Sequence, residues 1–233
     1  MTVHEMITTS RILVLAAAMA GSLVPAEARA DETPQEHSGF QFALRSGVAI
    51  PFGSVSTRTA MSDALSVQVP LIADIGWKPI PQLFIGGFLG AAVGGAAGQI
   101  EASCDRLGLN CVGLGLRAGA LVELSFRPGA ATNPWIGYGI GYEYGQSSGS
   151  SGSRSISNTV RGFEFAHILG GVDFRLQKYF GIGPFIDAAL GKYDVAESET
   201  NYGGLVATRG GGQINEQAFH VWLILGVRVV MLP

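Results

Sequence analysis

Charge and long hydrophobic runs are both scarce in this sequence. Charged residues make up only 14% of the chain, and its formal net charge of -3 is spread without a basic stripe or an acidic block. This distribution predicts no nucleic-acid partner. Beyond the first 30 residues, no apolar run is long enough to cross a bilayer as a helix. Glycine, by contrast, is abundant, with 34 residues, which suits strands that face apolar surroundings.

Residues 1–30 are organised like a cleaved export signal. Arg11 precedes an apolar stretch over 12–24, and Ala28-Arg29-Ala30 places small residues at the two positions that a signal peptidase reads. We therefore predict a signal peptide over 1–30, followed by a flexible polar lead over 31–38. A membrane-anchoring helix is the alternative, but the stretch is short for a span.

Cysteine is limited to Cys104 and Cys111. A pair so close together in an exported chain predicts one disulfide. A metal site needs further ligands, and no histidine lies near this pair. The run Gly210-Gly211-Gly212 lacks the following Lys and helix of a phosphate loop. We therefore expect neither a metal nor a cofactor.

The rest of the chain alternates in hydrophobicity with a period of two. Phe40, Phe42 and Leu44 share one parity, while Gln41 and Arg45 share the other, which is the pattern of a β-strand. The same alternation predicts about eight strands, most of them longer than the strands of soluble sheets. They cover 40–50, 67–77, 83–95, 113–126, 136–144, 163–176, 180–193 and 219–231. In the sixth of these the parity shifts near Ala166, which predicts a β-bulge.

The connections between these strands alternate strictly in length. Short ones span 78–82, 127–133 and 177–179, and long polar ones span 53–66, 99–111, 145–159 and 196–217. Turns at one end and loops at the other are typical of an all-β, antiparallel up-and-down transmembrane barrel.

Aromatic residues are expected to form two belts at the membrane interfaces. The predicted belt at the turn end contains Trp77, Phe84, Phe126, Trp135, Phe174 and Phe180, and the belt at the loop end contains Tyr142, Tyr144, Phe163, Phe165, Tyr193 and Phe219.

Over residues 39–233 the pattern resembles the small outer-membrane β-barrel proteins of the OmpA and OmpX type. The stretch from Gly226 to Met231, a Gly followed by alternating apolar residues, is similar to the C-terminal assembly signal of that family, although Leu232-Pro233 replaces the usual terminal aromatic. The resemblance implies an eight-stranded barrel in the outer membrane. It also implies outer-membrane lipids and, during biogenesis, the assembly machinery as partners. An even strand number places both mature termini at the short-turn end, which is the periplasmic side.

Charged residues are expected inside this barrel, on the face opposite the large apolar residues. They are Arg45, Asp74, Arg117, Glu123, Glu143, Asp173, Arg175, Asp187 and Arg228. Because the interior of so narrow a barrel is filled by side chains, its charges must be paired or hydrated. We predict an ion-pair network that plugs the lumen. A narrow pore or a proton path is the alternative.

His167 and His220 are the candidate general bases. Lipid-modifying enzymes of the resembled family use a His with a Ser near the loop end, but Val221 and Trp222 follow His220, with no Ser at a matching spacing. We therefore expect no catalytic residue, and we predict a structural or surface-interaction role through long extracellular loops that bind an extracellular partner. The alternatives are a membrane-embedded lipid-modifying enzyme and a secreted barrel that holds a small apolar ligand.

Overall fold

The computed structural model describes residues 38–107, 110–151, 154–202 and 205–233. Contacts divide the chain into two units, Met1–Thr33 and Pro34–Pro233, and the described residues all belong to the second. The predicted signal peptide, 1–30, and most of the predicted lead, 31–38, lie outside the described residues and stay predictions.

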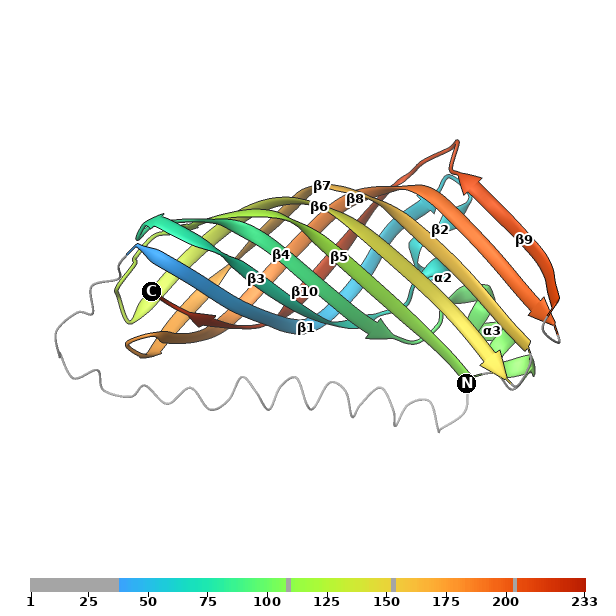
Figure 1. Cartoon of the computed structure of the whole chain (residues 1–233), viewed down its shortest axis with the longest axis horizontal. Helices are drawn as coiled ribbons and strands as arrows, with labels where there is room; N and C mark the ends of the chain where they lie inside the picture. Colours follow the sequence, from blue (N-terminus) through green and yellow to red (C-terminus); the bar gives the residue numbers. More distant parts are fainter. Residues whose placement is uncertain (1–37, 108–109, 152–153, 203–204) are drawn as a thin grey trace. The chain divides into compact units, whose positions relative to one another are not determined.

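The second unit consists almost entirely of antiparallel strands (Figure 1). In chain order the elements are β1 (Gly39–Ser56), β2 (Thr59–Ala60), α2 (Met61–Ala64), β3 (Gln68–Ile80), β4 (Leu83–Gly94), α3 (Gly98–Leu107), β5 (Asn110–Ser125), β6 (Thr132–Ser151), β7 (Arg154–Gln177), β8 (Phe180–Tyr202), β9 (Leu205–Gln213) and β10 (Phe219–Met231).

Eight of these strands close into a ring. From β1 the pairing runs through β3, β4, β5, β6, β7 and β8, and β10 closes the ring by pairing with both β8 and β1. Each predicted strand coincides with one strand of the ring, so the predicted up-and-down β-barrel is confirmed. A closed ring leaves no free strand edge within the barrel wall, so every wall strand has a hydrogen-bonding neighbour on both sides.

Side chains alternate between the outside and the inside of the barrel. On β3, Leu71 is 58% exposed, whereas Ile72 and Asp74 are fully buried. On β4, Leu89 is 64% exposed and its neighbour Phe88 is buried. The outer face therefore carries large apolar side chains, which is the arrangement required by a lipid environment.

The ends of the described barrel lie together at the short-turn end. Leu232 N–H donates a hydrogen bond of 3.0 Å to the carbonyl of Tyr179 in the β7–β8 turn. Gly39 lies against Pro233, because a Cβ placed on Gly39 would come within 2.7 Å of the Pro233 Cβ. The two ends of the described barrel thus lie at the short-turn end, while the periplasmic location of the mature termini stays a prediction.

Two of the predicted long loops are extensions of the sheet, so their prediction as loops was wrong. The segment 145–159 continues the β6–β7 ladder as far as the pair Ser151↔Arg154. The segment 196–217 contains the end of β8 and β9, which pair with each other. Beyond a membrane both faces of a hairpin can meet water, so a strand there needs no apolar side and leaves no alternating signal.

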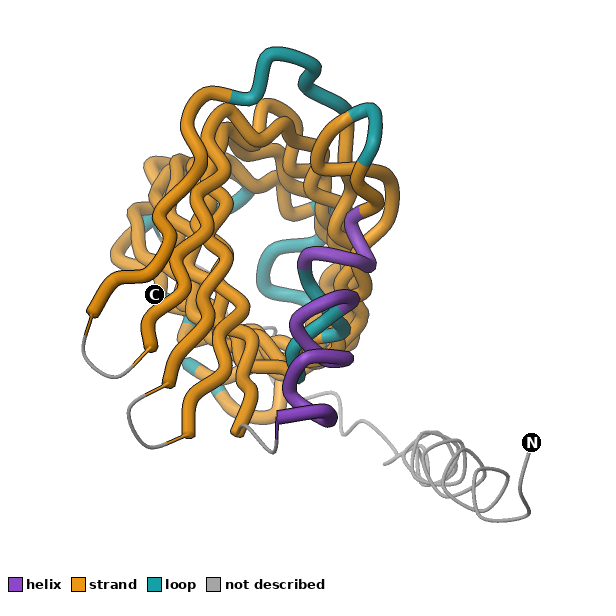
Figure 2. Tube along the Cα trace, turned by 90° about the vertical axis from the view of Figure 1, so that its right-hand side faces the viewer, coloured by secondary structure: helices purple, strands orange, loops and turns teal. Residues whose placement is uncertain are grey.

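The other two long connections contain short helices. The helices α2 and α3 lie at the loop end of the barrel (Figures 1 and 2). From α2, Met61 joins the buried core, and Leu65 follows it there. Neither helix, nor any other helix among the described residues, is long and apolar enough to cross a membrane.

The predicted bulge near Ala166 is confirmed. The β7–β8 register shifts between Glu164 and Ala166, which face Gly191 and Leu190. One extra residue on β7 reverses the parity of the strand beyond it. Glu164 and His167, which lie an odd number of residues apart, therefore both point inward and are fully buried.

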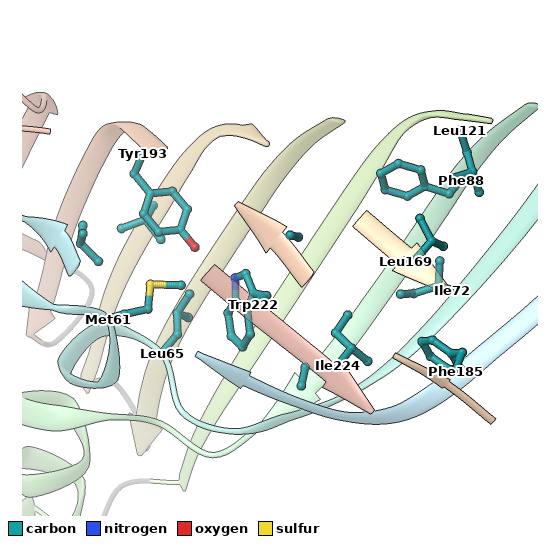
Figure 3. Close-up of a cluster of buried hydrophobic side chains, with 14 of the residues drawn as sticks. Met61, Leu65, Ile72, Phe88, Leu121, Leu169, Phe185, Tyr193, Trp222 and Ile224 are labelled. Atoms are coloured by element: carbon teal, nitrogen blue, oxygen red, sulfur yellow. The ribbon is translucent and has the colours of Figure 1, made fainter. Parts of the chain in front are cut away.

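Large apolar side chains also fill much of the interior (Figure 3). Ile72, Leu121, Leu169 and Ile224 belong to one buried cluster with Phe88, Phe185 and Trp222. Three residues predicted for the membrane belts, Phe84, Trp135 and Tyr193, are buried in the same cluster. Their assignment to the belts was wrong because only their height along the strands was considered. Trp77, Phe126, Tyr142, Phe163 and Phe219 are exposed on the outer face, as the belts require.

Candidate functional site

The interior polar side chains form three clusters. In the cluster toward the turn end, Arg228 Nη2 donates to Glu123 Oε2 at 2.7 Å, and Arg228 Nη1 lies 3.7 Å from Asp173 Oδ2. Gln41 Nε2 donates to the same Glu123 oxygen at 3.3 Å. The Arg228 guanidinium also lies 4.1 Å from the centre of the Trp135 ring, so the buried charge meets both a carboxylate and an aromatic face.

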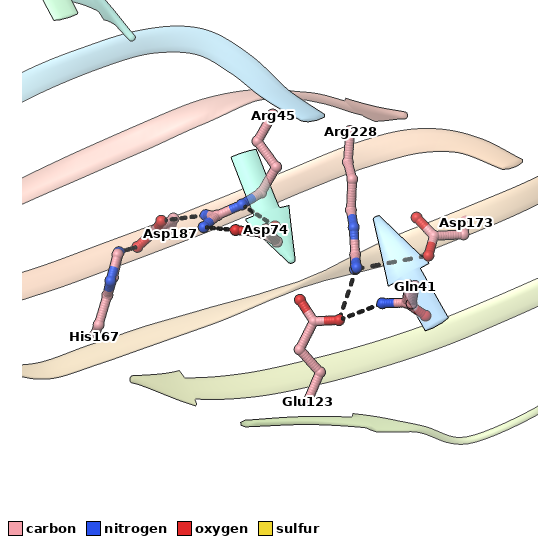
Figure 4. A network of polar contacts seen from close by, with 8 residues as sticks. All are labelled: Gln41, Arg45, Asp74, Glu123, His167, Asp173, Asp187 and Arg228. Carbon is pink, nitrogen blue, oxygen red and sulfur yellow. Dashed lines mark hydrogen bonds and ion pairs between the residues drawn. The ribbon is translucent and has the colours of Figure 1, made fainter. Parts of the chain in front are cut away.

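The central cluster is organised by Arg45 (Figure 4). Its Nε and Nη2 donate to the two carboxylate oxygens of Asp74, both at 2.8 Å, and its Nη1 donates to Asp187 Oδ2 at 2.7 Å. His167 Nε2 lies 2.6 Å from the second oxygen of Asp187. All four side chains are fully buried. This two-pronged contact between a guanidinium and a carboxylate is the strongest geometry that such a pair offers.

The third cluster is built around Arg117. Its Nη2 lies 3.6 Å from Glu143 Oε2, and its Nη1 lies 3.4 Å from Glu164 Oε1. His220 Nε2 contacts the other oxygen of Glu143. The ring of Tyr193 stacks on His220, with 4.1 Å between ring centres. The cluster therefore joins β5, β6, β7, β8 and β10 across the lumen.

Eight of the nine predicted network residues belong to these three clusters, and Arg175 is the ninth. That residue is partly exposed near the turn end, where its Nη1 donates to the carbonyl of Lys178 at 2.8 Å. Its membership of the buried network stays a prediction.

Several interior residues were missed by the sequence reasoning. Gln41 and Lys78 are buried, and each shares the parity of a predicted neighbour, Arg45 or Asp74, so the signal for them was present. Glu164 was missed because the bulge on β7 changes the parity there. His167 and His220, which were considered as candidate general bases, each lie against a carboxylate.

The two candidate general bases lie inside the barrel. Both histidines are turned into the lumen and fully buried, away from any lipid on the outer face. Among the described residues, no group of three or more His, Cys, Asp or Glu side chains is arranged to hold a metal ion. In each cluster one arginine lies against two carboxylates, which pairs charges that have been removed from water.

The predicted disulfide is present at the loop end. Cys104 on α3 is bonded to Cys111 at the start of β5, with 6.3 Å between their Cα atoms. Cys104 is buried against Ala96. The bond therefore ties α3 to the wall of the barrel.

Replacing Cys104 and Cys111 together by Ala should loosen α3 without unfolding the barrel. A loop this short contributes about 2 to 3 kcal/mol by restricting the unlinked chain. Amide hydrogen exchange should become faster over Gly98–Leu107 and remain unchanged in β3 and β4. Equal loss of protection in all these elements would show that the bond supports the whole barrel.

Solved structures of outer-membrane proteins are similar to this barrel. A major outer membrane protein from Thermus thermophilus matches with a TM-score of 0.54 and 10% identity, over 84% of this chain and 99% of that one. The fold is that of an outer-membrane β-barrel. Neisserial surface protein A matches over 83% of this chain and 99% of its own, with 18% identity and a TM-score of 0.40. OprG from Pseudomonas aeruginosa matches over 86% and 99%, with 12% identity and a TM-score of 0.45.

No protein-family model matches the chain, and no curated protein matches its sequence. The likeness to the solved structures concerns the fold alone. The predicted outer-membrane barrel is confirmed at that level, and its apolar outer face is the surface that this fold presents to lipid.

Proposed function

We propose that this protein is a non-enzymatic outer-membrane barrel whose lumen is closed and which acts through its loop end, by surface interaction or by supporting the envelope. The observation that carries the proposal is the set of three buried clusters. They are centred on Arg45, Arg117 and Arg228, with apolar side chains packed among them. An eight-stranded barrel is just wide enough for side chains to fill, so such clusters leave no continuous path for ions.

The proposal predicts that the folded barrel conducts little or no steady current in a planar lipid bilayer. Folding is checked on the same sample by a gel, because a closed barrel migrates differently before and after boiling in detergent. A large and stable conductance from heat-modifiable protein would favour the narrow pore instead.

The proposal also predicts that the loop end faces the outside of the cell. Glu199→Cys places a thiol on an exposed position of the β8–β9 hairpin, and Lys178→Cys places one on an exposed position of the β7–β8 turn. A membrane-impermeant maleimide added to intact cells should label the first variant and not the second. Both should be labelled after the outer membrane is permeabilised. Labelling of Lys178→Cys alone in intact cells would show that the turn end, and not the loop end, faces the outside of the cell.

An enzymatic role receives less support. A lipid-modifying enzyme needs its base at the lipid-facing surface, whereas His220 is buried between Glu143 and the ring of Tyr193. The closed lumen and the elaborate loop end are better explained by a role at the cell surface.

A further inference from the structure

The loop end encloses a pocket that is separate from the three charged clusters. Its volume is about 770 Å³, within the range of small-molecule sites. Its walls come from the end of β1, from β2, from both helices and from β7, β8 and β9. Figure 1 shows α2, α3, β2 and β9 gathered at this end of the barrel.

The floor of the pocket is apolar. Among the described residues, its apolar lining includes Val55, Ala64, Ala102, Val160, Ala196 and Ile214. Val55 and Val160 are also members of the buried core, which continues below them through Met61 and Leu65. A bound molecule therefore meets a closed hydrophobic floor and not the charged lumen.

Some of the described charged side chains around the pocket form ion pairs, and one does not. Arg58 Nε lies 3.7 Å from Glu216, and Arg161 Nη2 lies 3.4 Å from Glu197. Asp63, which also lines the pocket, has no ion-pair or hydrogen-bonding partner among the described residues. Among the described residues that line the pocket, Asp63 is therefore the carboxylate that is available to a ligand.

The backbone places Asp63 at this wall through a close contact between the two helices. Gly98, at the start of α3, has φ of 55°. A Cβ at Gly98 would come within 2.8 Å of the Asp63 Cα, so only glycine lets α3 begin so close to α2. The disulfide between Cys104 and Cys111 then holds α3 against the barrel wall.

We propose that this pocket binds a small amphipathic cation, with its apolar body on the Val55 and Val160 floor and its ammonium group at Asp63. An apolar lining with a few polar groups that fix orientation is the usual design of a small-molecule site. A neutral molecule with the same body would gain the floor but not the ion pair. An anion would face an unpaired carboxylate and be disfavoured. The ligand binds above this floor and does not enter the lumen. Binding at this site is therefore independent of whether the lumen conducts ions.

The test uses the mature barrel in lipid nanodiscs and three probes with one common body, 4-phenylbutylamine, 4-phenylbutanol and 4-phenylbutyrate. Binding is measured by calorimetry at neutral pH, with empty nanodiscs correcting for partition into lipid. The amine should bind about threefold or more tightly than the alcohol, which is the scale of a partly exposed ion pair, and the carboxylate should bind most weakly. Added salt should narrow the difference between amine and alcohol.

Three variants assign the effect to residues. Asp63→Asn should make the amine and the alcohol bind equally while leaving the alcohol's affinity unchanged. Glu199→Gln removes a negative charge from an exposed position outside the pocket lining and should leave the preference for the amine intact. Ala102→Trp fills the pocket from an exposed position on α3 and should weaken the amine and the alcohol by about tenfold, because their apolar contacts are lost.

The outcomes separate clearly. Binding no stronger than to empty nanodiscs would overturn the proposal. So would equal affinity for the amine and the carboxylate, or binding that survives Ala102→Trp in a barrel that still shows its heat-dependent gel shift. A conducting lumen would contradict the proposed closed barrel but would leave this pocket and its ligand preference unaffected.

Discussion

Replacing Arg45 by Met should lower the free energy of unfolding by about 3 to 5 kcal/mol, because it leaves buried carboxylates without their base. Arg45 makes three short hydrogen bonds to Asp74 and Asp187, and all three side chains are fully buried. Methionine fills a similar volume, so the loss of stability is due to the removed charge and not to a cavity. The measurement is the urea unfolding of the barrel in detergent micelles or lipid, followed by its gel shift.

The matched control is Arg58→Met, which removes the same side chain from an exposed position. Arg58 lies 3.7 Å from Glu216 and its side chain is 85% exposed, so the change should cost less than about 1 kcal/mol. The double change Arg45→Met with Asp74→Asn should cost less than the sum of the two single changes. Additive costs, or an Arg45→Met barrel as stable as the original, would contradict a paired network.

Replacing Leu89 by Arg should impair insertion into the membrane by about 2 to 4 kcal/mol, because it exposes a charge to the middle of the lipid layer. Leu89 is 64% exposed and lies near the middle of β4, between Ala73 and Ala118 on the neighbouring strands. The fraction of protein that folds into liposomes, read from the gel shift, measures the loss.

The control for this change lies on the same face of the same strand. Val93 is exposed near the loop end of β4, so Val93→Arg places the new charge near the membrane surface, where the cost falls to about 0 to 1 kcal/mol. Equal insertion of the two variants would mean that this face does not contact the hydrocarbon layer. Leu89→Arg and Arg45→Met should also affect different properties. Leu89→Arg should lower the fraction of protein that inserts, and Arg45→Met should lower the resistance of the folded barrel to urea.

Much of the barrel could be predicted from periodicity because a membrane barrel has two unlike sides. Where lipid lies outside and polar groups lie inside, as on β1 with Phe40 outside and Arg45 inside, the strand has an apolar and a polar parity. That contrast vanishes beyond the membrane. The loop-end parts of β6 and β7 are composed mainly of Ser, Gly and other polar residues, so they show no apolar alternation and were expected to form a loop, although backbone pairing continues through them.

The candidate site was predictable in part for the same reason. Parity alone places Arg45, Asp74 and Arg228 in the interior, and the structure agrees. Parity does not say which acid meets which base, because partners such as Arg45 and Asp187 are 142 residues apart in the chain. Only the order and stagger of the strands around the ring bring such partners to the same level along the barrel axis.

The sequence by itself determined the class of the fold, the number and order of the barrel strands, the inward face of most charges and the disulfide. These features depend on local alternation and short spacings, which any chain of this pattern would satisfy in the same way. Tertiary structure alone decided the division of the charges into three clusters, the inward turn of Glu164 beside Arg117, and the pocket at Asp63. The physical reason is ring closure together with one bulge on β7, because these set the register in which distant side chains face one another across the lumen.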